Sequence, residues 1–393
     1  MARALYLGLP LHGHVNPSLA LVRALVERGE EVLYPCTPAF APTIAATGAQ
    51  VLPYTTLLDA GHLATPFALA SHEFEAAVRQ VYVTAARFEA RYALVDGLSL
   101  WGRALALALR LPIVSVYTTY APPPLPEEAL PSFPLPVTRE LRAPSGEILR
   151  ASSAFDLLST LALTLERLRA APGFASLTPW QVVRDPARLA LVCTLSEFQP
   201  YPEALTGPHV FTGPSLDPSR LAHDWTPPDD RPLVYLSLGT LFNDDPAVLA
   251  RCLAAFPDGV YRVVVGGTPP GVESPSPPIT LLAHAPQPAV LRHARVFVTH
   301  GGMNGLMEAL AAGVPVVASP FTNEQANNAR TAERLGLGLH LDRTNLDAPR
   351  LRAAVDRITD DPSFRARALA LNAAERGRAG VRAATEAVLA ATR

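Results

Sequence analysis

Short apolar runs alternate with stretches of helical periodicity along the chain. The first run covers residues 3–9, and apolar residues at helical spacing follow at residues 19–26. Asn16 is expected to cap this helix, with Pro17 at its first helical position, and a second apolar run follows at residues 31–36. The order of strand, helix and strand predicts a Rossmann-like α/β unit around a parallel sheet.

The alternation of strands and helices returns in the second half of the chain, after a segment rich in proline and glycine at residues 199–220, which we interpret as the linker between two domains. Four apolar runs there are typical of buried parallel strands: residues 233–238, 261–265, 279–283 and 296–299. A chain of 393 residues also exceeds the roughly 250–300 residues at which a single hydrophobic core stops growing. We therefore predict two domains, residues 1–212 and residues 213–393.

One strand, turn and helix junction in the second half has the features of an anion site. The last of the four apolar runs ends in a histidine and two glycines at residues 300–302, where a helical pattern begins. Such a junction aims backbone N–H groups and the positive end of a helix dipole at one point, and glycine lets a phosphate come close. Asn304 and Glu308 are four residues apart, so they share one face of this helix. A carboxylate at that depth suits ribose hydroxyls, and the stretch predicts a nucleotide-sugar pocket.

Two histidines follow the first predicted strand, and an aspartate follows another. His12 and His14 lie where open α/β sheets bind ligands, and Asp96 ends the apolar run at residues 92–95. In a doubly wound sheet Asp96 would be adjacent to the first strand end. A buried carboxylate fixes the tautomer of a histidine base and stabilises its imidazolium form. The alternative is structural, since a histidine can close a turn and an aspartate can cap a helix.

Composition and charge exclude several other classes of protein. The net charge of −2 provides no basic field for nucleic acid. All 33 basic residues are arginines, which excludes a P-loop lysine, a Schiff-base nucleophile and a pyridoxal phosphate anchor. The three cysteines have no metal-ligand spacing and are expected to be reduced. No run approaches the ~20 apolar residues of a membrane span, so we expect a cytoplasmic protein without a metal site.

The segment from residue 284 to residue 328 resembles the donor-binding signature of family 1 glycosyltransferases, in particular the bacterial macrolide and flavonoid branch. The matching elements fall in order: Gln287 of the HAPQ turn, the HGGMN run at 300–304, Glu308, and the EQANN run at 324–328. The resemblance implies the GT-B fold, in which two Rossmann-like parallel-sheet domains face each other across a cleft. It further implies that a last helix, at about residues 381–393, packs back on the first domain.

The resemblance also implies a role for particular residues. His14 would be the general base that deprotonates the acceptor hydroxyl, held by Asp96. The residues expected to bind the donor are Thr240, His284, Ala285, Gln287, His300, Gly302, Met303, Asn304, Gly305, Glu308, Glu324 and Gln325. Of these, Glu324 and Gln325 would hold sugar hydroxyls, and Gln325 favours glucose.

Two positions depart from the family pattern. His284 replaces the aromatic residue that stacks on uracil in plant relatives, which leaves uridine and thymidine donors both open. Gly305 stands where many relatives have a serine, so one hydroxyl donor to phosphate is lost.

Irregular, proline-rich segments at residues 54–74 and 117–137, with the helical pattern at 148–169, are expected to form the acceptor cleft. The candidate acceptor-binding residues are His12, Phe67, Phe74, Tyr117, Tyr120 and Phe133. These rings favour a flat hydrophobic acceptor such as a flavonoid, another phenolic or a macrolide, although aromatic side chains at such positions more often serve packing.

Together these features predict an inverting UDP-glycosyltransferase, a hexosyltransferase that needs no metal or cofactor. The expected donor is UDP-glucose, with a dTDP-sugar as the other possibility, and the expected acceptor is a hydrophobic small molecule. Three alternatives remain at this point: a transferase acting on a lipid or cell-wall precursor, a nucleotide-sugar 2-epimerase of the same fold, and an idle nucleotide-sugar binding module.

Overall fold

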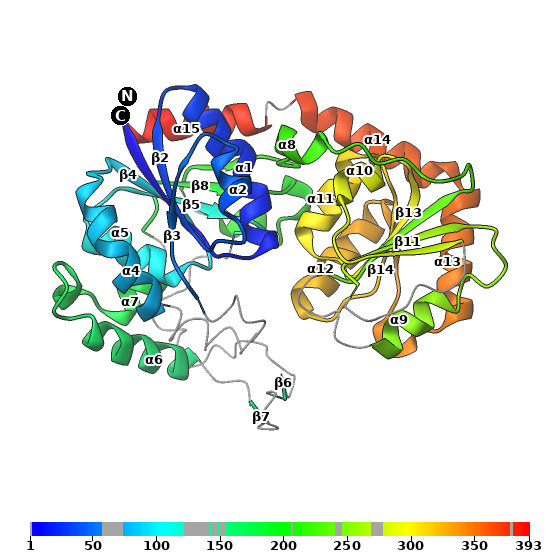
Figure 1. Ribbon diagram of the computed structural model, residues 1–393, viewed down its shortest axis with the longest axis horizontal. Helices are drawn as coiled ribbons and strands as arrows, with labels where there is room; N and C mark the ends of the chain where they lie inside the picture. Colours follow the sequence, from blue (N-terminus) through cyan, green and yellow to red (C-terminus); the bar gives the residue numbers. More distant parts are fainter. Residues whose placement is uncertain are drawn as a thin grey trace. The chain divides into compact units, whose positions relative to one another are not determined.

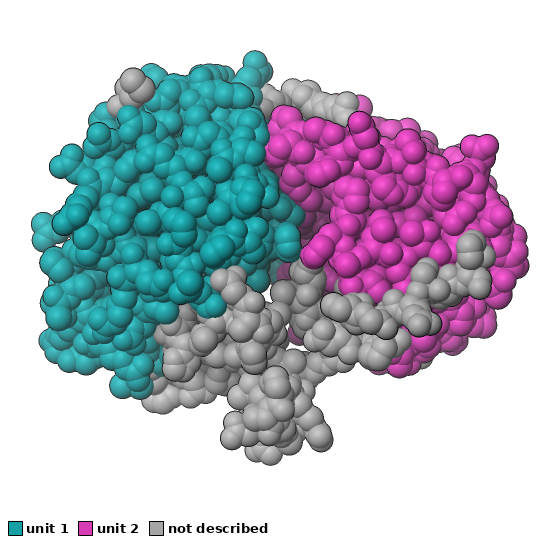
Figure 2. Space-filling model, in the orientation of Figure 1, with its two compact units in different colours: residues 1–193, 199–212, 381–393 teal, residues 194–198, 213–380 magenta. Residues whose placement is uncertain are grey.

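The computed structural model describes residues 2–56, 74–121, 141–142, 148–149, 154–184, 186–205, 207–239, 246–268, 278–377 and 380–393. The chain forms two compact units (Figures 1 and 2). Unit 1 contains Met1–Cys193, Gln199–Thr212 and Val381–Arg393, and unit 2 contains Thr194–Phe198 and Gly213–Gly380. Each unit is an α/β domain around a parallel sheet, which confirms the predicted fold class.

The described part of unit 1 is built on seven parallel strands in the order β3-β2-β1-β4-β5-β8-β9. The strands are β1 (Arg3–Leu7), β2 (Glu31–Cys36), β3 (Gln50–Pro53), β4 (Tyr92–Asp96), β5 (Ile113–Tyr117), β8 (Leu189–Val192) and β9 (His209–Phe211). The helices are α1 (His12–Glu27), α2 (Ala41–Ala45), α4 (Phe74–Arg87), α5 (Leu100–Ala108), α6 (Ala154–Arg167), α7 (Pro179–Val183) and α15 (Gly380–Thr392). A separate antiparallel pair consists of β6 (Leu141–Arg142) and β7 (Ile148–Leu149). The strand order reverses between β1 and β4, where open α/β sheets bind their ligands.

Helices cover both faces of this sheet (Figure 1). Alternate residues of β1 point to opposite faces, so Leu5 and Leu7 join the core beneath α4, α5 and α6, whereas Tyr6 joins the core beneath α1 and α2. The C-terminal helix α15 packs on the second of these cores through Ala384 and Val388, both fully buried. The last helix of the chain is therefore part of unit 1.

The described part of unit 2 has six parallel strands in the order β12-β11-β10-β13-β14-β15. They are β10 (Leu233–Ser237), β11 (Arg262–Gly266), β12 (Ile279–Leu282), β13 (Ala294–Thr299), β14 (Val316–Ala318) and β15 (Gly338–His340). The helices are α8 (Pro218–Leu221), α9 (Pro246–Leu253), α10 (Gln287–Leu291), α11 (Met303–Ala311), α12 (Asn323–Arg334), α13 (Ala348–Asp360) and α14 (Pro362–Gly377). Short 3₁₀ turns in the described residues of the two units are η4 (Phe174–Ser176), η5 (Ser196–Phe198), η6 (Pro202–Ala204) and η7 (Arg343–Asn345). Here the strand order reverses between β10 and β13.

The start of α1 differs from the sequence expectation. The backbone N–H of Val15 donates to the carbonyl of Leu11 at 2.8 Å, so the helix begins at His12 and contains both Asn16 and Pro17. The proline is tolerated because it forgoes only one intrahelical hydrogen bond near the helix start. The two histidines thus belong to the first helical turn and not to a preceding loop. A second difference is β9, a strand that lies inside the segment predicted to be a linker.

Two glycines within helices differ in the space that a side chain would have at each position. A Cβ atom at Gly102 of α5 would lie 2.7 Å from the Cβ of Leu7 and 2.7 Å from Oγ of Ser99, whereas a Cβ at Gly305 of α11 would have its nearest neighbour, a ring carbon of Phe297, at 3.5 Å. We expect Gly102→Ala to lower the free energy of unfolding by about 1–3 kcal/mol through overpacking. Gly305→Ala should raise it by about 0.5–1 kcal/mol, because alanine is the better helix former. Urea unfolding midpoints measure both, and equal midpoints for the two variants would contradict this account.

Candidate functional site

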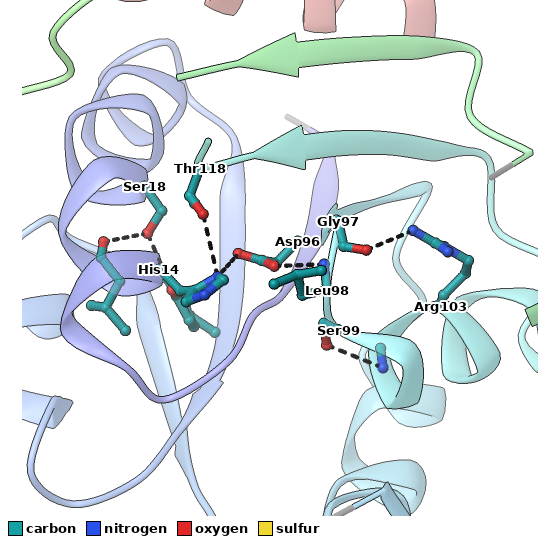
Figure 3. A network of polar contacts seen from close by, with 11 residues as sticks. His14, Ser18, Asp96, Gly97, Leu98, Ser99, Arg103 and Thr118 are labelled. Atoms are coloured by element: carbon teal, nitrogen blue, oxygen red, sulfur yellow. Dashed lines mark hydrogen bonds and ion pairs between the residues drawn. The ribbon is translucent and has the colours of Figure 1, made fainter. Parts of the chain in front are cut away.

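The first site lies at the end of β1 in unit 1. The register of β1 and β4 places Leu7 opposite Val95, so Asp96, the last residue of β4, lies beside the turn that leads into α1. His14 is in the first turn of that helix, and its Nδ1 atom is 2.8 Å from Oδ2 of Asp96 (Figure 3). The sheet thus brings together the two residues that the sequence predicted as a pair.

Several contacts fix the carboxylate of Asp96, whose residue is 1% exposed. Its Oδ1 atom accepts the backbone N–H of Leu98 at 2.9 Å. It does not cap α5, because Ser99 does so by accepting the N–H of Gly102 at 3.3 Å. With Nδ1 of His14 directed at the carboxylate, the tautomer that donates from Nδ1 leaves the Nε2 lone pair to act as a base.

A buried arginine supports the turn that follows Asp96. Arg103 of α5 is 3% exposed, and its Nη2 donates to the carbonyl of Gly97 at 3.1 Å (Figure 3). Its Nη1 donates to the carbonyls of Val182 and Val183 at 3.1 and 3.0 Å. Sequence analysis missed this residue, although an arginine within an otherwise apolar helix is a usable signal of a buried contact.

Two stacked tyrosines pack beneath this end of α1. The rings of Tyr6 and Tyr34 are 4.4 Å apart, and Oγ of Ser18 is 3.1 Å from the Tyr34 hydroxyl. Burial raises the pKa of both phenols well above the usual value, and the negative charge of Asp96 adds to this effect. Both rings are therefore neutral at physiological pH.

Two of the predicted acceptor residues are core residues in the structure. Phe74 is 1% exposed and belongs to the core of unit 1. Tyr117 is 8% exposed and packs with Ala121 and Val192. These rings stabilise the interior, which argues against the acceptor-binding role that their position in the sequence suggested.

The other predicted acceptor residues have different surroundings. His12 is exposed, and its ring packs edge to face with that of Phe40, with 4.9 Å between the ring centroids. Tyr120 is partly buried just beyond the end of β5. Phe67 and Phe133 lie outside the described residues.

The second site is the junction of β13 and α11 in unit 2. Gly301 has a φ of 82°, a conformation that favours glycine, and its N–H donates to Oγ1 of Thr299 at 3.3 Å. Gly302 is the N-cap of α11 and offers no side-chain cap, and the first turn contains no acidic residue. A Cβ atom at Gly302 would lie 2.4 Å from Nε2 of His300. Any residue larger than glycine at this position would therefore clash with the His300 ring. The open N-terminus of α11 can bind an anion.

His300 is neutral in this setting. Burial lowers the pKa of its imidazole to about 4. A hydrogen bond with the Ser237 backbone acts in the opposite direction and raises the pKa. At neutral pH it therefore carries no positive charge.

A buried carboxylate lies one turn further along α11. Glu308 is 1% exposed; its Oε1 accepts from Asn304 at 2.9 Å and from Arg220 at 2.5 Å, and its Oε2 accepts from Gln287 at 2.7 Å. The hydroxyl of Tyr235 in turn donates to Oε1 of Gln287 at 3.2 Å. The structure gathers three predicted donor-site residues and adds Arg220, which sequence analysis missed because nothing local distinguishes it from other arginines.

Gln325 has a structural role at the start of α12. Its Oε1 accepts the N–H groups of Phe321 at 2.8 Å and Thr322 at 3.3 Å, and its own N–H donates to Oγ1 of Thr322 at 3.3 Å. This is a capping box, which stabilises the helix end. Only the amide nitrogen of its side chain is left for the sugar hydroxyl that sequence analysis assigned to it.

Glu324 and Asn328 connect α12 to the junction of β13 and α11. The Nδ2 atom of Asn328 donates to Oε1 of Glu324 at 2.6 Å and to the carbonyl of Gly301 at 3.1 Å. Asn328 is fully buried. It was not among the predicted site residues, and it ties the glycine turn to the helix that carries Glu324.

The remaining predicted donor residues are placed as follows. His284 is exposed and Ala285 is partly buried in the loop before α10. Met303 is 4% exposed, and its sulfur accepts from the hydroxyl of Thr194 at 3.1 Å, so its side chain belongs to the core and only its backbone can face a ligand. Thr240 lies outside the described residues.

Two further kinds of feature are absent from the described residues. They contain no group of three or more histidine, cysteine, aspartate or glutamate side chains arranged to hold a metal ion. No helix among them is both long enough and apolar enough to cross a membrane.

Comparisons with known proteins agree with this geometry. The family model described as UDP-glucoronosyl and UDP-glucosyl transferase matches residues 217–380. NDP-glycosyltransferase YjiC from Bacillus licheniformis is 31% identical over 373 residues, which cover 90% of this chain and 88% of that protein. The solved structure of CalG4, the calicheamicin glycosyltransferase, is 28% identical with a TM-score of 0.74, covering 100% of this chain and 98% of that chain. The structure of the glycosyltransferase of kitacinnamycin has a TM-score of 0.78 at 24% identity, covers 100% and 99% of the two chains, and supports the fold alone.

The matched segment contains the anion site of α11, and the similarity to YjiC extends over both units. The family prediction is thereby confirmed, and the chain belongs to the family 1 glycosyltransferases of the GT-B fold.

Proposed function

We propose that this glycosyltransferase inverts the sugar configuration as it moves a hexose from a nucleoside-diphosphate sugar to a hydroxyl of a hydrophobic small molecule. The names of its relatives, an NDP-glycosyltransferase and a calicheamicin glycosyltransferase, support the donor and acceptor classes. UDP-glucose is the donor that we favour, and a phenolic or macrolide is the acceptor. The observation that carries the proposal is the contact of 2.8 Å between His14 and the buried carboxylate of Asp96.

The proposed chemistry follows from the orientation of the histidine. Asp96 accepts a hydrogen bond from the Nδ1–H of His14, and this proton stays on the ring, so the unprotonated Nε2 takes the proton of the acceptor hydroxyl. The hydroxyl oxygen forms a bond to the anomeric carbon on one face of the sugar, while the bond from that carbon to the diphosphate breaks on the other face. The products are an inverted glycoside, a nucleoside diphosphate and an imidazolium ion that Asp96 stabilises. General-base assistance of this kind is worth roughly 10²–10⁴ in rate.

The departing diphosphate needs stabilisation, which we assign to the anion site of unit 2. The first-turn N–H groups of α11 and the positive end of its dipole supply it, beside the neutral ring of His300. Fixed dipoles of this kind can stabilise the leaving group without a metal ion, and we propose that no metal is required. Glu308 would hold the ribose, and the amide nitrogen of Gln325 with Glu324 would hold the sugar.

We expect His14→Gln to lower kcat/KM by about 10²–10⁴, the range of general-base catalysis. Asp96→Asn should also lower it strongly, because the amide favours the wrong tautomer of His14. His209→Gln, which replaces an exposed histidine of β9, is the matched control and should stay near the wild-type value. Mass spectrometry of glycosides formed from UDP-glucose and a phenolic panel, with a chelator present, measures all three. Full activity of His14→Gln would refute the base assignment, and loss of wild-type activity on chelation would refute metal independence.

The lowered pKa of His300 predicts how stability depends on pH. The ordinary histidine pKa is 6.5 and the folded value is about 4, so the unfolded chain binds a proton between these values that the folded chain does not. The contribution of His300 to the free energy of unfolding is therefore fully present above pH 6.5 and decreases as the pH falls toward 4. The urea midpoint of the wild type should decrease more between pH 7.5 and pH 5 than that of His300→Gln, which cannot titrate. Identical decreases would show that His300 is not protected from protonation by burial.

Gly305 offers a test of the diphosphate site. It is the third residue of α11, and a side chain fits there. Gly305→Ser adds a hydroxyl donor in the first turn, and we expect it to bind UDP about 3–10-fold more tightly, the value of one net hydrogen bond. Gly305→Ala also raises the helix propensity at this position but adds no hydroxyl, and it should leave the Kd unchanged. Calorimetric titration with UDP separates the two, and equal Kd values would place the phosphates elsewhere.

A further inference from the structure

The peptide group between Gly97 and Leu98 is hydrogen-bonded at both of its ends. Its carbonyl accepts from Nη2 of Arg103 at 3.1 Å, and its N–H donates to Oδ1 of Asp96 at 2.9 Å. The other carboxylate oxygen, Oδ2, is 2.8 Å from Nδ1 of His14 (Figure 3). One chain of hydrogen bonds therefore leads from the guanidinium, through this peptide and the carboxylate, to the imidazole.

The orientation of this peptide group decides where the N–H of Leu98 points. In a trans peptide the C=O and N–H bonds point in opposite directions, so a donor that fixes the carbonyl also fixes the N–H. Gly97 has no Cβ, and its backbone can rotate where other residues are restricted. The hydrogen bond from Arg103 opposes such a rotation and keeps the N–H directed at Asp96.

Arg103 is in turn held by a second element. The residue is 3% exposed, and its Nη1 donates to the carbonyls of Val182 and Val183, at the end of α7, at 3.1 and 3.0 Å. Within the described residues the guanidinium bonds to backbone carbonyls and to no carboxylate, and its buried Nε has no hydrogen-bond partner. A buried cation without a counter-ion lowers stability compared with an apolar side chain of similar size. Packing alone therefore does not explain an arginine at this place.

We propose that Arg103 is a positioning residue of the transfer reaction: through the peptide between Gly97 and Leu98 it holds the Asp96 carboxylate in the orientation that keeps His14 in its Nδ1–H tautomer. The inference rests on the proposed function, in which His14 is the base. Without the guanidinium the peptide rotates, Oδ1 loses its N–H donor, and the carboxylate no longer fixes the ring. Nε2 then carries the proton in part of the molecules, and these cannot deprotonate the acceptor.

Replacement of the arginine by methionine tests this in the full-length protein. We expect Arg103→Met to lower kcat by about 10–100-fold, as a slightly misplaced catalytic group does, with KM for UDP-glucose within about threefold of the wild type. NMR of the ring nitrogens in histidine-labelled protein should show that the Nδ1–H form of His14 is depleted, and His14→Gln identifies the signals. Phe174→Leu, which alters a residue buried in the core of unit 1, is the matched control for lost stability. It should retain the wild-type kcat and tautomer.

A proline tests the same peptide from its other end. Leu98→Pro removes the N–H that Asp96 accepts, and it costs little packing because Leu98 is 63% exposed. It should reproduce both effects of Arg103→Met. Leu98→Ala retains the N–H and should show the wild-type tautomer.

The outcomes separate this inference from the proposed function. A folded Arg103→Met variant with wild-type kcat and tautomer would overturn the inference and leave the role of His14 intact. Depletion of the Nδ1–H form in Phe174→Leu would also overturn it, because any loss of stability would then have this effect. If Arg103→Met does not fold, equal tautomers in Leu98→Pro and Leu98→Ala would overturn it. Full activity of His14→Gln would instead refute the proposed base, and the tautomer measurement does not depend on that result.

Discussion

Parallel pairing of neighbouring strands is the constraint on which both sites depend. Because β1 and β4 run in the same direction and in register, they leave the sheet at the same edge. This places the end of β4 beside the first turn of α1, although His14 and Asp96 are 82 residues apart in the sequence. The same arrangement recurs in unit 2, where β13 pairs with β10 and continues into α11. Reactive groups therefore gather at strand ends, while the strands themselves remain apolar core.

Local compensation of buried charge gives these strand ends their rigidity. Asp96 is hydrogen-bonded to the His14 ring and to a backbone N–H. Glu308 pairs with Arg220, and Arg103 donates hydrogen bonds to three backbone carbonyls. An uncompensated buried charge costs several kcal/mol, so each partner fixes the orientation of the group it faces. A chain without lysine meets this need with the planar guanidinium, whose fork of donors can reach several acceptors at once.

The features that sequence analysis predicted correctly are those encoded by local pattern. The strands, the glycine junction and the contact of His14 with Asp96 follow from apolar runs and from the doubly wound strand order. The features that it missed depend on tertiary partners. Arg220 is one of many arginines until α8 is placed against Glu308, and Phe74 begins a helix whose buried face is set by α5 and α6. Residues 54–74 and 117–137, expected to contain the acceptor cleft, lie largely outside the described residues.

The proposed phosphate site would bind the diphosphate through dipoles and not through a positively charged side chain. This difference affects product release. The stretch from Thr299 to Gly305 contains no arginine, and His300 is neutral because its pKa is lowered to about 4. Stabilisation of the leaving diphosphate then comes from the fixed backbone of α11, which needs no reorganisation when the bond breaks. A cationic clamp would bind the product diphosphate as firmly as the transition state, and product release would slow the cycle. A neutral histidine beside an uncapped helix end adds no full positive charge, so it attracts the product diphosphate less strongly than such a clamp would.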